Sequence, residues 1–319
     1  MPKVSVIIPV YGVEEYMERC ARSLFKQTLD DIEYLFIDDC TPDRSIDILK
    51  SVLEEYPNRK NQVVIHRMEQ NSGQAAVRKW GMQNATGDYV IHCDSDDWVD
   101  VDMYRAMYEK AVEDDADVVV CNYVESDNQS VCKRTKGYRN QTYQGFILDL
   151  MYRKVSWALW NKLVKRKLID NIVCYPSKNL GEDMLLLFQM LKGTEKIMFV
   201  NGYYYYYFIN PTSITHVDTI EKSVLNFTQA KDNYDRVADI MSQSPTREEV
   251  RAIKYMRYFQ KSRLLPYFSD KEVRSLYYSY YNDCDWDVVC NSQLPTKDRI
   301  RCLLAKLRIY GLLKSISKK

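Results

Sequence analysis

The first third of the chain alternates short apolar runs with amphipathic segments, and this alternation restricts the fold more than any other feature. Apolar, β-branched runs predict strands at residues 4–10, 32–37, 63–66, 89–92 and 117–123. Segments with helical spacing of their apolar residues lie between them, at residues 14–27, 46–56 and 101–112. Strands that are apolar almost throughout are typical of a parallel sheet with helices on both faces, so we predict an α/β fold.

Acidic residues cluster where two of these predicted strands end. They are Asp38, Asp39, Asp94, Asp96 and Asp97. Ligands of open α/β sheets bind at the carboxyl ends of the strands. Crowded carboxylates raise one another's pKa unless a cation joins them, and a hard divalent metal would keep them ionised. Taken alone, the acids are equally consistent with ordinary loop residues and helix caps.

Charge and cysteine content exclude several classes of protein. The chain has 45 Lys and Arg against 44 Asp and Glu, a net charge of +1, so no overall field attracts nucleic acid. Its nine Cys residues are odd in number and form no CxxC pair, which predicts reduced thiols in a cytoplasmic protein. Met1 leads almost directly into a strand and no apolar run is long enough to cross a bilayer, so we expect neither signal peptide nor membrane span.

Several motifs in a fixed order resemble the family 2 glycosyltransferases over residues 1–215. They are Val4 to Tyr11, Ile37 to Asp43, Asn71 to Gly73 with Arg78, and Asp94 to Trp98. The resemblance implies a GT-A fold, with a mostly parallel, Rossmann-like central sheet and flanking helices. It also implies an inverting enzyme that uses nucleotide-diphospho-sugars. We therefore expect a catalytic domain at residues 1–218 and a helical region at 219–319.

The resemblance assigns the nucleotide to the first strand ends. Pro9 and Tyr11 would lie against the base, and Asp39 would accept a hydrogen bond from its N–H edge, as uracil offers. For Tyr11 the alternative is packing on the core. Asn71 and Gly73 precede a helix whose start suits phosphate, because it offers unpaired N–H groups and a positive dipole end. A plain loop and cap remain the alternative there.

The fourth strand carries the expected metal site. By resemblance, Asp94 contacts the ribose, and Asp96 holds Mg²⁺ or Mn²⁺ between the two phosphates. Arg78 would lie near the donor sugar or its phosphate; the alternative is an arginine on a solvated helix face. We expect Asp97 to cap the helix that follows rather than to support the site.

Two segments of the middle third resemble the acceptor side of these enzymes. Glu182 and Asp183 precede an apolar helix at 184–191 and resemble the family's Glu-Asp pair, in which the Asp is the general base. A sugar hydroxyl needs such a base near neutral pH. Simple N-terminal capping is the alternative. Trp157 and Trp160 would offer flat faces to an acceptor sugar, or pack beneath a helix.

The chain between Lys196 and Ile209 predicts a hairpin that turns at Asn201-Gly202. Many relatives carry an arginine just before the next loop, where it helps to bind the diphosphate, but this chain has Phe208. His216 would complete the metal site or reach the leaving phosphate; the alternative is a surface or packing residue.

The resemblance fades beyond about residue 220, where helices are predicted at 220–241, 247–268 and 271–281. The pattern of residues 296–319 predicts a basic amphipathic helix. Such a helix binds an anionic membrane surface at the inner face of the cell membrane, or docks on the domain with a solvated basic face.

We therefore predict a metal-dependent, inverting glycosyltransferase of bacterial polysaccharide assembly. It would transfer a hexose from a UDP-linked donor to a glycan or lipid-linked acceptor. Two alternatives are a nucleotidyltransferase that makes the sugar nucleotide, and a catalytically silent binding module. The segment after the first strand lacks the glycine- and lysine-rich triphosphate loop expected of the former.

Overall fold

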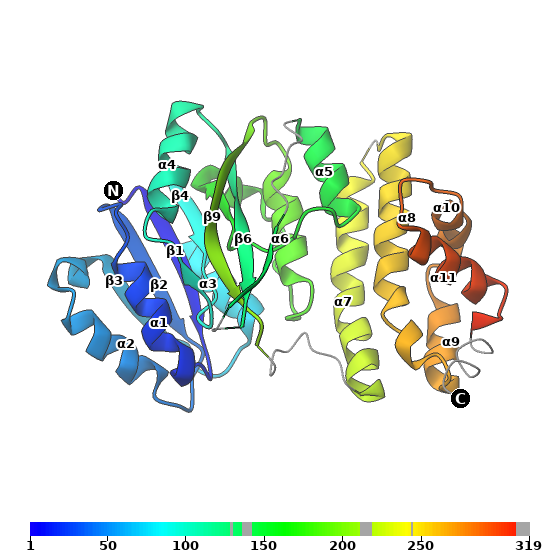
Figure 1. The fold of residues 1–319 in the computed structure, drawn as a ribbon, viewed down its shortest axis with the longest axis horizontal. Coiled ribbons are helices and arrows are strands. Elements are labelled where there is room, and N and C mark those ends of the chain that lie inside the picture. The colour runs from blue at the N-terminus through cyan, green and yellow to red at the C-terminus, as the bar shows by residue number, and fades with distance from the viewer. Residues whose placement is uncertain (128–129, 136–141, 211–218, 244, 311–319) are drawn as a thin grey trace. The chain divides into compact units, whose positions relative to one another are not determined.

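The computed structural model describes residues 1–127, 130–135, 142–210, 219–243 and 245–310. These residues belong to two compact units (Figure 1). Unit 1 comprises residues 1–143, 158–179 and 186–213, and unit 2 comprises residues 144–157, 180–185 and 214–319. Because unit 2 takes two segments from inside the expected catalytic domain, the boundary at residues 218–219 stays a prediction.

One mixed sheet forms the centre of unit 1, in the order β3-β2-β1-β4-β8-β6-β9-β5, with β7 paired to β6. Its strands are β1 (Val4–Val10), β2 (Ile32–Asp38), β3 (Val63–Arg67), β4 (Tyr89–His92), β5 (Trp98–Val99), β6 (Val118–Ser126), β7 (Val131–Arg134), β8 (Lys162–Lys165) and β9 (Ile197–Phe208). β1 to β4 pair in parallel, and β6 is parallel to β9. β8 runs antiparallel to both β4 and β6, and thus joins the two parallel parts.

The predicted hairpin between Lys196 and Ile209 is wrong. β9 is one continuous strand, and both of its halves pair in parallel with β6. The register shifts where Cys121 pairs with Val200 and the next residue of β6 pairs with Tyr203. Asn201-Gly202 is therefore a bulge in a long strand instead of a turn. The dipeptide signals a local change of backbone direction, and the pairing partner decides whether a turn or a bulge results.

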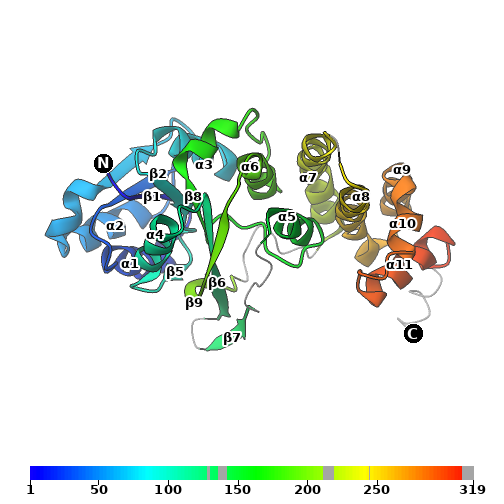
Figure 2. The same ribbon diagram turned by 90° about the horizontal axis from the view of Figure 1, so that it is seen from above.

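Helices cover both faces of the sheet in unit 1 (Figure 2). They are α1 (Glu14–Phe25), α2 (Ser45–Glu54), α3 (Gln74–Asn84), α4 (Met103–Glu113) and most of α6 (Glu182–Leu191), with 3-10 turns at Pro57–Gln62 and Arg166–Asn171. Val4, Val6 and Ile8 pack in one buried cluster with α1 and α4. Ile7 points to the other face, where a Cβ on Gly81 of α3 would lie 2.5 Å from its Cγ2. Glycine at that position lets α3 approach the sheet closely.

Unit 2 is helical. It contains α5 (Tyr143–Met151), the start of α6, α7 (Ile220–Met241), α8 (Arg247–Ser262), α9 (Lys271–Ser279), α10 (Asp285–Val289) and α11 (Thr296–Lys306), with 3-10 turns at Leu265–Tyr267 and Asn282–Cys284. A core cluster joins Phe227, Phe268 and Tyr277 with smaller apolar side chains. The predicted bounds of α7 agree with the structure because its caps and apolar stripe are local signals.

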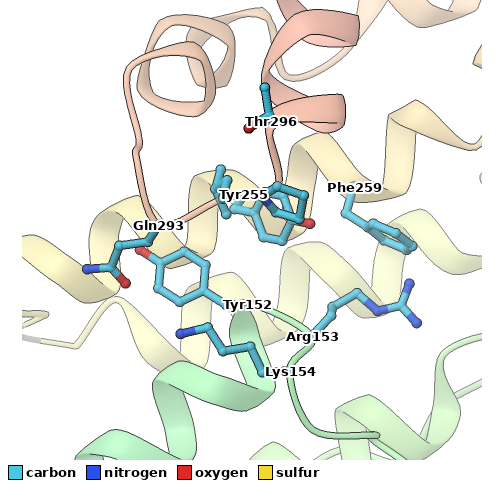
Figure 3. A pocket seen from close by; sticks show the side chains of 9 residues that line it. Tyr152, Arg153, Lys154, Tyr255, Phe259, Gln293 and Thr296 are labelled. Carbon is cyan, nitrogen blue, oxygen red and sulfur yellow. The ribbon is translucent and has the colours of Figure 1, made fainter.

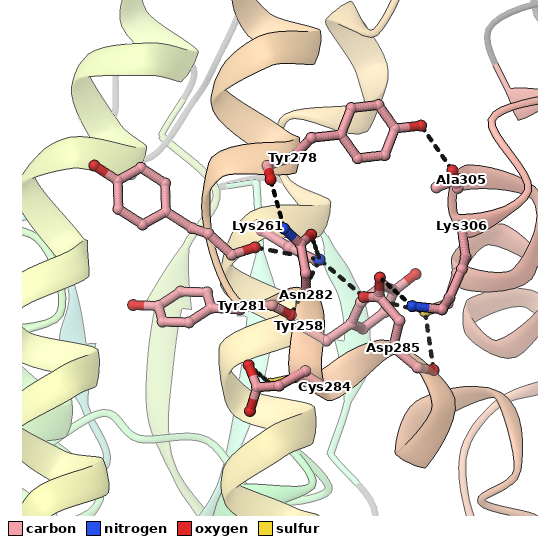
Figure 4. Close-up of polar contacts among 12 residues, drawn as sticks. Tyr258, Lys261, Tyr278, Tyr281, Asn282, Cys284, Asp285, Ala305 and Lys306 are labelled. Atoms are coloured by element: carbon pink, nitrogen blue, oxygen red, sulfur yellow. Dashed lines mark hydrogen bonds and ion pairs between the residues drawn. The ribbon is translucent and has the colours of Figure 1, made fainter.

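A buried lysine of α8, Lys261, is bonded to the chain that follows α9. Lys261 is 0% exposed, and its Nζ lies 2.8 Å from Oδ1 of Asp285, whose side chain is 5% exposed (Figure 4). The same ammonium donates to the carbonyl oxygens of Tyr280 and Tyr281 at 3.4 and 3.2 Å. Lys306 of α11 lies 3.8 Å from the second carboxylate oxygen of Asp285. The group is a compact charge network inside unit 2.

The C-terminal stretch packs partly on unit 2. Cys302 and Ala305 of α11 are buried, whereas Ile300 and Leu307 are more than half exposed. Tyr278 donates a hydrogen bond to the carbonyl oxygen of Ala305 at 2.7 Å. α11 therefore docks on the helical unit, as one of the two alternatives predicted. Residues 311–319 lie outside the described residues. Contact with a membrane stays a prediction.

All nine cysteines are free thiols, as the sequence predicted. Within the described residues, no helix combines the length and apolar character that crossing a bilayer requires.

Candidate functional site

The carboxyl ends of β1, β2 and β4 lie side by side, and this adjacency brings the predicted donor residues together in unit 1. The amide of Asp39, directly after β2, donates to the carbonyl of Val10 at 3.0 Å. The amide of Cys93, directly after β4, donates to the carbonyl of Ile7 at 3.0 Å. Backbone pairing thus places the residues that follow three strands at one sheet edge.

Asp39 is buried, and its carboxylate holds the loop before α3. Its two oxygens accept hydrogen bonds from the amides of Ser72 at 2.7 Å and Gly73 at 2.8 Å. A carboxylate has further lone pairs, so Asp39 keeps capacity for one more donor. Asn71 directly precedes this pair of amides and is exposed. At the end of β1, Tyr11 is 50% exposed, so its ring is not part of the core.

The start of α3 is closed by Asn179. Its Oδ1 accepts from the amide of Ala75 at 3.2 Å. Gly73 has φ of +80°, and a Cβ at this residue would lie 2.5 Å from the Asn179 side chain. Glycine therefore suits this residue both by conformation and by space. Since Asp39 and Asn179 accept from three amides at the start of α3, this helix start offers a phosphate fewer free N–H groups than the sequence indicated.

Arg78 of α3 is buried and paired with the acidic loop. It is 3% exposed, and its guanidinium lies 3.0 Å from Oδ1 of Asp94, which is 24% exposed. Gln74 also donates to that oxygen, at 3.4 Å. The alternative of a solvated arginine is therefore wrong. Burial and then the charge of Arg78 lower the pKa of His92 well below its usual value, so this histidine is neutral.

Asp96 and Asp97 have different surroundings although they are adjacent. Asp96 accepts from the side-chain amide of Asn210 at 3.2 Å, and burial together with the charge of Asp94 raises its pKa. Asp97 accepts from the hydroxyl of Tyr205 and the amide of Phe208, both at 2.6 Å. Burial, with the charges of Asp96 and Asp94, raises the pKa of Asp97 well above its usual range.

The expectation that Asp97 caps the following helix is wrong. α4 begins at Met103, and Asp97 bonds to β9 instead. The hydroxyl of Tyr205, which donates to Asp97, also accepts from the amide of Asp94 at 3.1 Å. One tyrosine hydroxyl thus ties both ends of the acidic loop to β9. The sequence carries no signal for this role, because Tyr205 is one of five consecutive tyrosines.

The proposed acceptor tryptophan is a packing residue. Trp160 is 6% exposed and stacks on Tyr205, with ring centroids 4.1 Å apart and planes 9° apart. Its ring is therefore not available as a platform for a sugar, and the packing alternative holds. In unit 2, the indole N–H of Trp157 donates to the carbonyl of Leu150 at 2.7 Å.

The predicted base belongs to unit 2. Asp183 is partly exposed in the first turn of α6, and its Oδ1 accepts from the amide of Met184 at 2.7 Å. Glu182 is 6% exposed. The loop before them is held by Asn233 of α7, which donates to the carbonyl of Leu180 at 2.8 Å. His216 lies outside the described residues.

Sequence comparison identifies the chain's family. The sequence model of glycosyl transferase family 2 matches residues 5–175, more than half of the chain. The chain belongs to glycosyl transferase family 2. This family 2 member is 32% identical over 237 residues to Glycosyltransferase GlyA of Streptococcus pneumoniae, an alignment that covers 68% of the chain and 32% of the relative. It spans between 32% and 64% of the length of the first curated relatives that it matches.

Solved structures confirm the fold of this family 2 member. S. aureus TarS 1-349, in complex with UDP-GlcNAc, has a TM-score of 0.61 at 17% identity and covers 99% of this chain and 91% of its own. The mannosyltransferase PcManGT of Pyrobaculum calidifontis, in complex with GDP-Man and Mn²⁺, has a TM-score of 0.59 at 13% identity, with 100% and 88% covered. These likenesses confirm the predicted α/β fold of the GT-A type.

Phe208 packs on an arginine that sequence reasoning missed. Arg19 of α1 donates to the backbone carbonyl of Asp96 at 2.6 Å. Its guanidinium lies 3.9 Å from the ring centroid of Trp98 and 5.2 Å from that of Phe208. In this family 2 member, a cation from α1 thus reaches the acidic loop. Its position in an ordinary amphipathic helix gave no hint of this contact.

The acidic loop of this family 2 member suits a hard cation by its oxygen ligands. Within the described residues, no group of three or more His, Cys, Asp and Glu side chains forms a ready metal cluster. Burial and the charge of Asp94 raise the pKa of Asp96, so a cation beside these carboxylates would stabilise the ionised form of Asp96. Mg²⁺ usually takes one or two carboxylates and completes its shell with water and substrate phosphates. The two acids fit that pattern.

Proposed function

We propose that this protein is an inverting, metal-dependent glycosyltransferase. It transfers a sugar from a nucleotide-diphospho-sugar to a hydroxyl of a glycan or lipid-linked acceptor in bacterial polysaccharide assembly. The observation that carries the proposal is the gathering of Asp39, Asp94 and Asp96 at one edge of the sheet in a family 2 chain. Nine free thiols agree with the reducing cytoplasm expected from the sequence.

The donor's nucleotide would lie at the ends of β1 and β2. Tyr11, half exposed beside Pro9, offers its ring to the base. Asp39 would accept from the base while it holds the loop at Gly73. A UDP-linked donor is supported by the imide N–H of uracil, which suits a carboxylate. The UDP-GlcNAc bound by TarS supports it too.

The diphosphate would lie beside the acidic loop. A divalent ion held by Asp96, with Asp94 beside it, would offset negative charge on the departing nucleotide diphosphate. Mn²⁺ or Mg²⁺ suits these oxygen ligands, and PcManGT holds Mn²⁺. Arg78 orients Asp94 through their ion pair and brings positive charge to the phosphate side. Tyr205 holds the backbone of the loop in place.

Asp183 would act as general base on the acceptor. Removing the proton of the attacking hydroxyl raises its nucleophilicity as the bond to the anomeric carbon forms. The hydroxyl would attack opposite the leaving nucleotide diphosphate, which inverts the configuration. The dipole of α6 favours the ionised form of a carboxylate in its first turn. Glu182 would support Asp183 from within the buried start of the helix.

A panel of nucleotide sugars tests the proposal directly. We expect at least one donor to release its nucleotide diphosphate in the presence of Mn²⁺ or Mg²⁺. EDTA should abolish that release, and excess metal should restore it, because the carboxylates need a cation beside the diphosphate. Activity unchanged by EDTA would remove the metal from the mechanism, and absence of turnover with every donor would favour a silent binding module.

Tyr205→Phe is expected to weaken nucleotide-sugar binding by about tenfold or more, since it removes hydrogen bonds to a carboxylate and to the loop backbone, each worth about 1–3 kcal/mol. Tyr207→Phe, two residues along β9, is the matched control, because no described residue is bonded to that hydroxyl. Isothermal titration with the nucleotide sugar measures both. Equal affinities for the two variants would show that Tyr205 does not position the acidic loop.

A further inference from the structure

Unit 2 contains a pocket of about 570 Å³ that the reaction described above does not use. It lies among the end of α5, the middle of α8 and the loop before α11 (Figure 3). Its lining includes Tyr152, Arg153, Lys154, Tyr255, Phe259 and Gln293. The pocket thus combines three aromatic rings, two cations and one amide. Its volume is in the range that small-molecule sites occupy.

Arg153 is stacked on an aromatic ring and keeps its hydrogen-bond donors free. Its guanidinium lies 3.8 Å from the ring centroid of Phe259 and 4.9 Å from that of Trp157. In the part of the chain that the structure describes, no carboxylate pairs with it. A guanidinium that packs over a ring face contacts it through its π face, and its N–H groups are not used in that contact. These N–H groups match the oxygens of a carboxylate or a phosphate in a bidentate manner.

The backbone of Arg153 is in a conformation that favours glycine. Its φ is +58°, and its amide donates to the carbonyl of Leu150 at 3.1 Å, where α5 ends. Glycine is the usual residue at such a helix end, because any side chain there costs about 1 kcal/mol. Compared with glycine, arginine at this position therefore carries a backbone cost. Its stacked side chain in the pocket supplies a reason for its presence.

The hydroxyls of the two tyrosines that line the pocket are bonded to carboxylates. The hydroxyl of Tyr152 donates to Glu248 at 2.5 Å, and that of Tyr255 donates to Asp298 at 3.0 Å. Lys154 lies 5.4 Å from the ring centroid of Tyr152 and 3.2 Å from a carboxylate oxygen of Asp149. The acids around the pocket are thus engaged by hydroxyls and by Lys154, whereas the guanidinium of Arg153 is not engaged by any of them.

We propose that this pocket binds a sugar residue that carries a phosphate or carboxylate group, within an anionic glycan acceptor. Rings such as Tyr255 and Phe259 pack against the C–H face of the sugar, the amide of Gln293 bonds to its hydroxyls, and Arg153 binds its anionic group. The acceptor role rests on the proposed function, because a transferase must hold the chain that it extends. The binding itself does not depend on turnover.

Four small probes separate the parts of this proposal. Glucose 6-phosphate, glucuronate, glucose and inorganic phosphate are titrated into the full chain and followed by ligand-observed NMR. We expect glucose 6-phosphate, glucuronate or both to bind about tenfold more tightly than glucose and inorganic phosphate, because the two halves of the pocket act together. Equal binding of glucose would remove the anionic requirement, and equal binding of inorganic phosphate would remove the sugar. The anionic sugar that binds more tightly shows whether the pocket prefers a phosphate or a carboxylate group.

Arg153→Gly tests whether the binding occurs in this pocket. It removes the guanidinium and relieves the backbone, so we expect about tenfold weaker binding of the anionic sugar with a melting temperature that is unchanged or higher. Phe259→Ala should weaken binding as well, and Lys271→Ala, an exposed cation at the start of α9, should not. Binding that is unaffected by Arg153→Gly would overturn the assignment.

The two proposals can fail separately. A chain that turns over a nucleotide sugar but binds none of the four probes would overturn the pocket and leave the proposed function intact. A chain that binds an anionic sugar through Arg153 but turns over no nucleotide sugar would support the pocket and contradict the proposed function.

Discussion

Asp183→Asn is expected to lower the turnover number by about 10²- to 10⁴-fold, the usual contribution of a general base. The asparagine amide keeps an oxygen that can accept from the amide of Met184, as Asp183 does at 2.7 Å, so the start of α6 is preserved. It cannot take the proton of an acceptor hydroxyl. Nucleotide-sugar affinity should be unchanged, because the donor residues Asp39, Asp94 and Asp96 are untouched. Steady-state turnover and isothermal titration with the donor measure the two effects.

Asp270→Asn is the matched control for this prediction. Asp270 caps α9 of unit 2 and accepts from the amides of Glu272 and Val273, so the substitution makes the same chemical change at another helix start. Its turnover should equal that of the wild type. Wild-type turnover in Asp183→Asn would show that Asp183 is only a helix-capping residue. Loss of donor binding in that variant would indicate a structural role.

Lys261→Met is expected to reduce the free energy of unfolding by about 3–5 kcal/mol, since it leaves the buried carboxylate of Asp285 without its main partner. Lys261 and Asp285 are 2.8 Å apart, and both are almost completely buried. Lys306, at 3.8 Å and partly exposed, compensates for only part of the loss. Urea unfolding followed by circular dichroism measures the change.

The double variant Lys261→Met with Asp285→Asn completes this test. It removes both charges, and replacing a buried ion pair by neutral groups is often close to neutral for stability. We therefore expect the double variant to be more stable than Lys261→Met alone, and it keeps the test informative if the single variant does not fold. A cost below about 1 kcal/mol for Lys261→Met would mean that the pair contributes no more than an exposed one.

Much of unit 1 could be predicted because its signals are local. The runs that form β1 to β4 are mostly apolar, and each is followed by polar or turn-forming residues. Strands of this kind lie parallel between helices, so their carboxyl ends meet at one edge. The convergence of Asp39 and Asp94 follows from that rule, and the structure places both there.

The errors of prediction have one physical cause, which is dependence on a distant partner. Asn201-Gly202 has the composition of a turn, but β6 pairs with the chain on both sides of it and makes it a bulge. Asp97 has the composition of a helix cap, but Tyr205 and Phe208 of β9 bond to it. Trp160 has the composition of a sugar platform, but the ring of Tyr205 stacks on it.

The sequence by itself determined the strand and helix periodicities, the acids at the strand ends and the family. Those properties depend on residue type and on neighbours within a few positions. Only the tertiary structure decided that Arg78 is buried against Asp94, that Tyr205 holds the acidic loop and that Arg153 stacks on Phe259 at an aromatic pocket. The reason is physical: burial, charge pairing and ring stacking depend on distances between residues that are remote along the chain, and a local pattern contains no such distances.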